Sequence, residues 1–82
     1  MGTTDNKKKE LENFYQNIGG KLREIRITQG LGLSEAAKKL GLRKQELENF
    51  ETAKVRIHLF YFNKILDLYG IGFEEIMHHP TL

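Results

Sequence analysis

Two side-chain amides, Gln45 and Asn49, lie four residues apart, a spacing that brings both to one side of a helix. A side-chain amide carries a donor and an acceptor together, and this combination matches the major-groove edge of adenine. Lys44 and Glu48 complete the group, because lysine can bond to guanine or phosphate and a carboxylate can accept from the amino group of cytosine. These four residues could read base edges, although an ordinary polar helix surface would have the same composition.

Basic residues gather around this group. The segment Lys38–Arg56 contains six lysines and arginines and three glutamates, a net charge of +3, whereas the whole chain carries +2. Arg43, Lys54 and Arg56 flank the group and Lys38 lies shortly before it, so we expect these four cations to contact the sugar–phosphate backbone of DNA. A solvated surface of mixed charge is the alternative explanation.

The helix that would carry the group is itself acidic. Residues 44–51 hold one lysine and three glutamates, a net charge of −2. Carboxylates near phosphates weaken DNA binding, since like charges repel each other. Glu46 and Glu48 therefore favour a second interpretation, in which the same helix contacts another protein.

Two short amphipathic helices hinged on Gly41 would position the group. The spacing of apolar residues predicts helices at Leu33–Leu40 and Lys44–Thr52, and Gly41 is a favourable helix stop because glycine adopts the left-handed conformation at little cost. The residues expected to face the core are Ala36, Ala37 and Leu40 of the first helix and Leu47 and Phe50 of the second, with Leu42 following the glycine. This arrangement is typical of a helix-turn-helix, whose second helix can enter the DNA major groove.

Three further helices are predicted around this unit, and no segment shows the alternation of a strand. A long helix covers about Leu11–Thr28, with Gly19 and Gly20 weakening its middle. Another covers His58–Tyr69, and a short last helix ends before Pro80. The expected inner faces are Leu11, Phe14, Ile18, Leu22 and Ile25 in the first, and Leu59, Phe62, Ile65, Leu66 and Tyr69 in the second.

The bulk properties indicate one small globular domain. We expect a flexible basic tail at residues 1–10, a helix-turn-helix domain at residues 11–78 and a C-terminal tail at residues 79–82. No apolar run is long enough to span a membrane and no signal-peptide pattern is present, so a cytoplasmic protein is expected.

Catalysis and metal binding find no support in the residue types. The chain has no cysteine, no phosphate-binding glycine loop and no convincing triad or carboxylate dyad, so we expect neither an enzyme nor a cofactor. His58, His78 and His79 lack the pattern of a metal site, since adjacent tail histidines project in different directions.

The order and spacing of many residues resemble the XRE family, the phage-repressor and Cro type of helix-turn-helix protein, without a gap from Asn17 to Met77. The matching positions are Ile18–Arg26, Gly30–Leu31, Ala37, Leu40–Leu42, Leu47, Phe50–Glu51, Lys54, Leu59, Leu68–Ile71 and Phe73–Ile76. The resemblance implies an all-α, five-helix, lambda-repressor-like DNA-binding domain that dimerises and reads a pseudo-palindromic operator.

Family positions also assign a structural ion pair. In the family, an arginine of the first helix often pairs with a glutamate of the third, and Arg26 and Glu51 occupy these places, so Glu51 is expected to belong to the scaffold. Two residues depart from the pattern. Leu33 replaces a glutamine that often holds a phosphate, and Ala53 stands where glycine often follows the third helix.

Three apolar residues, Phe60, Tyr61 and Leu68, fall outside the expected inner face of their helix. Exposed aromatic area of this kind indicates a homodimer or partner interface, unless residues near the N-terminus cover it.

The sequence thus predicts a sequence-specific, double-stranded DNA-binding transcriptional regulator, dimeric and repressor-like. The alternative is a protein-interaction module on the same scaffold, similar to an antirepressor or antitoxin, with weak or no DNA binding.

Overall fold

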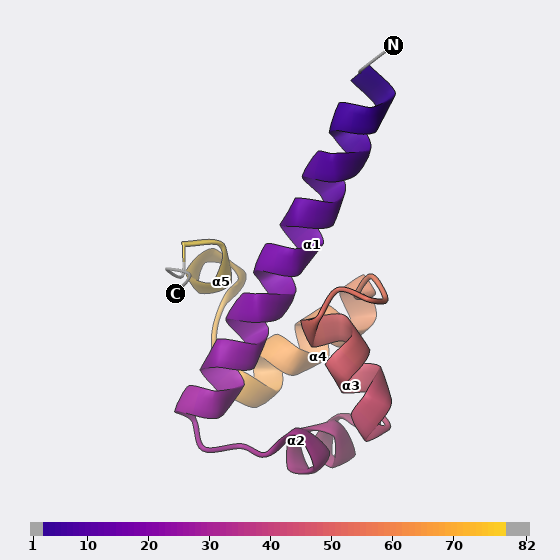
Figure 1. Ribbon diagram of the computed structural model, residues 1–82. Coiled ribbons are helices and arrows are strands. Elements are labelled where there is room, and N and C mark those ends of the chain that lie inside the picture. Colours follow the sequence, from indigo (N-terminus) through magenta and orange to yellow (C-terminus); the bar gives the residue numbers. More distant parts are fainter. Residues whose placement is uncertain (1–2, 79–82) are drawn as a thin grey trace.

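The computed structural model describes residues 3–78, with only the backbone for residues 3–6, so the tail expected at residues 79–82 lies outside the described part. Five helices follow one another with no strand in this range (Figure 1). They are α1 (Thr3–Thr28), α2 (Leu33–Leu40), α3 (Lys44–Glu51), α4 (Leu59–Tyr69) and α5 (Phe73–His78). The all-α, five-helix fold predicted from the sequence is confirmed.

The core lies where α2–α5 pack around the C-terminal half of α1. Ile18, Leu22 and Ile25 are the buried residues of the apolar stripe of α1. The other buried apolar residues are Ala36, Ala37, Leu40, Leu42, Leu47, Phe50, Phe62, Ile65, Leu66, Tyr69 and Ile76. Most of the predicted inner positions therefore lie in one continuous core.

The N-terminal half of α1 projects beyond the other helices (Figure 1). Residues 3–10, expected to form a flexible tail, are instead the first turns of this helix, and the segment from Lys7 onward is rich in strong helix formers. Leu11 and Phe14, expected in the core, are 44% and 47% exposed, because the remaining helices pack against the C-terminal half of α1. The molecule is correspondingly elongated, with extents of 44 × 25 × 22 Å.

The turn between α2 and α3 has the geometry that the glycine predicts. Gly41 has a φ of 74°, and the N–H groups of Gly41 and Leu42 donate to the carbonyl oxygens of Lys38 and Ala37 at 3.2 and 2.9 Å. This is a Schellman motif, in which the residue after the glycine returns to the core. Leu42 is buried there, which fixes the direction in which α3 leaves the turn.

The turn after α3 adopts the same left-handed conformation without a glycine. Ala53 has a φ of 60°, which costs a residue with a Cβ about 1–2 kcal/mol. Ala53, at a position where the family often has glycine, therefore keeps a left-handed backbone at a cost in stability.

The first turn of α4 differs from the prediction. His58 precedes the helix as its N-cap residue, and Leu59 is 71% exposed although it was expected on the inner face. Leu59 is the first residue of α4 and lies at the margin of the core. Phe62, Ile65, Leu66 and Tyr69 form the buried face as predicted.

No helix among the described residues is long and apolar enough to cross a membrane.

Candidate nucleic-acid interface

The outer face of α3 carries the four residues whose types could read bases. Leu47, Phe50 and Glu51 are buried on the inner side of this helix. Lys44, Gln45 and Glu48 are exposed and Asn49 is half-buried. With about 100° of rotation per residue, Gln45 and Asn49 point away from the core, and Lys44 and Glu48 lie beside them.

A hydrogen bond joins the two amides. Gln45 Nε2 donates to Asn49 Oδ1 at 2.9 Å. The bond leaves the Gln45 carbonyl oxygen and the Asn49 amino group for an external partner, and Asn49 Oδ1 retains a second lone pair. The pair is therefore ordered before it meets a ligand and presents donors and acceptors side by side, as recognition of a base edge requires.

Two of the three carboxylates of α3 have a structural partner. Glu46 Oε1 accepts a hydrogen bond from the Arg43 backbone N–H at 2.8 Å, which satisfies one of the free donors at the start of α3. Glu51 faces the core. Glu48 is exposed, and within the described part its carboxylate makes no hydrogen bond or ion pair. The exposed negative charge of α3 therefore comes from Glu46 and Glu48, because Glu51 is buried.

A buried ion pair holds α3 to α1. Arg26 Nε and Nη2 donate to the two carboxylate oxygens of Glu51 at 2.8 and 3.0 Å, and Arg26 Nη1 donates to the Leu31 carbonyl at 2.8 Å. Both side chains are less than one-tenth exposed. The bond to Glu51 raises the pKa of Arg26 above its ordinary value, so the guanidinium stays charged. Arg26 and Glu51 therefore lie as the family resemblance implied.

Gly19 allows this approach of α3 to α1. A Cβ at Gly19 would lie 2.5 Å from the Glu51 carbonyl oxygen and 2.6 Å from that of Phe50, whereas a Cβ at Gly20 would meet nothing within 4 Å. From the sequence, both glycines are expected only to weaken the helix. A glycine pair inside an otherwise regular helix can indicate a close helix contact, but it does not indicate which glycine makes the contact.

The expected backbone-contacting cations surround α3. Lys38 is in the last turn of α2, Arg43 precedes α3, and Lys54 and Arg56 follow it, all four being exposed. The Arg56 guanidinium lies 5.4 Å from the centre of the Tyr15 ring, a cation–π contact that links the segment after α3 to α1. Sequence periodicity gave no signal for this contact.

The three residues expected at a partner interface differ in exposure. Phe60 is 65% exposed, whereas Tyr61 and Leu68 are half-buried and pack against the core. The Tyr61 ring lies 6.0 Å from that of Phe50 and 5.2 Å from that of Phe60, centre to centre. Phe60 offers the most apolar area of the three to a partner.

The histidines do not converge in the described part of the chain. No group of three or more potential metal ligands occurs there. His58 lies against Phe50, with ring centres 6.5 Å apart, and His78 approaches Glu74 at 3.7 Å on the surface. His79 lies outside the described residues.

Comparison with known proteins identifies the family of the chain. A family model described as a helix-turn-helix domain matches residues 17–78. No curated protein matches the chain with significance. The family match covers the same segment as the five-helix body, including the turn at Gly41 and the outer face of α3. Because it spans more than half of the sequence, the protein belongs to the helix-turn-helix domain family, a family of DNA-binding proteins.

Proposed function

We propose that the protein is a transcriptional regulator that binds a specific double-stranded DNA site as a homodimer and acts as a repressor. The residues proposed to contact bases are Lys44, Gln45, Glu48 and Asn49, and those proposed to hold phosphates are Lys38, Arg43, Lys54 and Arg56. The observation that carries this proposal is the hydrogen-bonded pair of Gln45 and Asn49 on the outer face of the second helix of the motif.

The distribution of charge supports the same orientation on DNA. Arg43 lies at one end of α3 and Lys54 and Arg56 lie beyond the other, so a helix placed in the major groove would bring cations toward the phosphates on both sides. Glu51 is turned inward against Arg26 and does not oppose binding. The proposal requires no catalytic group, metal or cofactor.

Selection of bound sequences from randomised duplexes tests the proposal. We expect two inverted half-sites about one helical turn apart, because a two-fold dimer reads a two-fold site. Gln45→Ala should weaken the selected site by about 1–3 kcal/mol and relax one base position. Lys54→Ala should weaken selected and random DNA alike, and Lys21→Ala, beside α5, serves as the control cation. Failure to enrich any sequence would contradict the proposal.

A protein-interaction module remains the second candidate, since two observations favour it. Glu48 is an exposed carboxylate within the reading face, and Phe60 is an exposed aromatic residue on α4. A partner protein with a basic and partly apolar surface would contact both residues, and this contact would need no phosphate groups. This candidate predicts that duplex DNA is not retained by the folded protein at low salt.

A further inference from the structure

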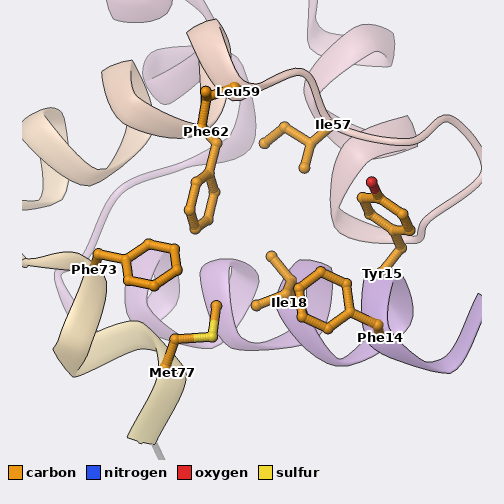
Figure 2. A pocket seen from close by; sticks show the side chains of 8 residues that line it. All are labelled: Phe14, Tyr15, Ile18, Ile57, Leu59, Phe62, Phe73 and Met77. Atoms are coloured by element: carbon orange, nitrogen blue, oxygen red, sulfur yellow. The ribbon is translucent and has the colours of Figure 1, made fainter. Parts of the chain in front are cut away.

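Large exposed apolar side chains gather on one side of the molecule. An open groove of about 200 Å³ lies between α1, the start of α4 and α5 (Figure 2). Phe14 and Ile18 of α1, Phe62 of α4 and Phe73 and Met77 of α5 point toward it. Ile18 and Phe62 form its buried floor, whereas Phe14 and Phe73 remain 47% and 57% exposed at its margin. Leu59, 71% exposed, adds to the same margin.

The projecting half of α1 carries an apolar ridge that continues from this groove. Leu11, Phe14 and Ile18 follow one another at helical spacing, so the stripe leaves the core at Ile18 and runs out along the projection. Residues 3–16 extend for about 21 Å at the usual helical rise. A helix of this length is marginally stable in water unless its apolar side is packed against another surface.

We propose that the groove is filled by a second copy of this chain, in a two-fold dimer where the projecting half of α1 of each copy lies in the groove of the other. A two-fold interface needs one surface that is complementary to itself. This surface fulfils that requirement, since each copy supplies a ridge at Leu11 and Phe14 and a groove beside Phe73.

Charge complementarity supports this occupant. The projection carries Lys7, Lys8 and Lys9, all exposed, and α5 presents the exposed Glu74 directly after Phe73, which lies at the margin of the groove. An exchange of projections brings the lysine run of one copy toward Glu74 of its partner. Opposite charges at the rim favour this pairing and disfavour alternative registers.

The inference deepens the dimeric part of the proposed function and places the contact on a different surface from Phe60. It does not depend on DNA recognition, so its test uses the protein alone. Failure of DNA binding and failure of this interface are therefore separate results.

Sedimentation equilibrium of the full chain without DNA provides the first test. We expect a dimer whose dissociation constant rises at least tenfold in Phe14→Glu and in Leu59→Glu. Ile27→Glu is the matched control, because Ile27 lies on the same helix with 55% exposure and does not line the groove. Circular dichroism identifies folded variants, and Leu59→Glu, at a more exposed position, decides the question if Phe14→Glu does not fold.

Charge reversal and cross-linking test the exchange of projections. Glu74→Lys should weaken the dimer, and its mixture with a Lys7, Lys8 and Lys9 to Glu variant should restore both rim contacts, one with the native charges and one with the charges reversed. The chain has no cysteine, so Lys8→Cys mixed with Glu74→Cys should give a disulfide between the two chains, whereas Ile27→Cys with Glu74→Cys should not. A strict monomer at high concentration, or a dimer that Phe60→Glu dissociates and Leu59→Glu does not, would overturn the inference.

Discussion

At the scale of single residues, Arg26 and Glu51 have the largest expected effect on stability. Their bidentate contact joins α1 to α3, and Arg26 also holds the Leu31 carbonyl between α1 and α2. Removal of one partner leaves the other charge buried without compensation. We predict that Glu51→Ala lowers the free energy of unfolding by about 3–5 kcal/mol, measured by urea denaturation.

The paired replacement provides the control for this prediction. Arg26→Met combined with Glu51→Leu removes both charges and should cost less than Glu51→Ala alone, because no unpaired charge remains. Additive losses in the double variant would show that the two side chains act independently.

A substitution of Glu48 distinguishes two roles that its carboxylate could have on the outer face of α3. If it accepts from a cytosine amino group, as we propose, Glu48→Gln should weaken binding to the selected site by about 1–3 kcal/mol and leave random DNA unchanged. A carboxylate that only repels phosphates predicts tighter binding of the variant to every sequence. Titration of selected and random duplexes at one salt concentration separates these results.

Tyr69 should make the free energy of unfolding decrease at alkaline pH. Burial raises the pKa of Tyr69 to about 12, from an ordinary value near 10. The unfolded chain therefore releases this proton at lower pH than the folded chain, and stability is lost as the pH rises from about 10 to 12. Between pH 9 and 11 we predict that Tyr69→Phe loses about 1 kcal/mol less unfolding free energy than the parent. Equal losses would contradict a buried, neutral phenol.

Single residues were predictable from the sequence where spacing or family position determines their place. The spacing of Gln45 and Asn49 predicts a shared helix side, but the hydrogen bond between them depends on rotamers. The role of Glu46 at the start of α3 is not evident from the sequence, because a capping box normally starts with serine or threonine and here starts with Arg43.

At the scale of helices, the two adjacent glycines of α1 have opposite roles. Gly19 lies against the α3 backbone, whereas Gly20 has free space around its Cα. We predict that Gly19→Ala destabilises the fold by more than 1 kcal/mol, since the helices must separate, and that Gly20→Ala stabilises it by up to about 1 kcal/mol. Thermal unfolding of both variants, which have the same composition, measures the difference. Equal shifts in both would contradict the close contact.

Helices α2 to α5 were predictable to within a residue or two because apolar spacing and glycine stops determine their ends. The start of α1 was not, since a polar lysine-rich segment reads equally as a tail or as an exposed helix. Leu59 was misassigned for a related reason: periodicity predicts the face of a residue, but not whether another helix reaches far enough to cover it.

At the scale of the whole molecule, the chain combines a helix-turn-helix body with a projecting helix end. The body carries the outer face of α3, which we propose reads bases (Figure 1), and the groove lies between α1, the start of α4 and α5 (Figure 2). Dimer formation and DNA reading would therefore use different surfaces of one domain. The sequence could not predict this division, because the groove is formed by residues from three separate helices.

The salt dependence of duplex binding tests the central claim most directly. If Lys38, Arg43, Lys54 and Arg56 each neutralise one phosphate, the logarithm of the association constant should fall with the logarithm of salt concentration with a slope of about −4 for each bound copy. Random duplexes should bind more weakly than the selected site while retaining a steep slope. A folded sample that binds no duplex at low salt, or binds with a slope near zero, would contradict DNA recognition and favour the protein-interaction module.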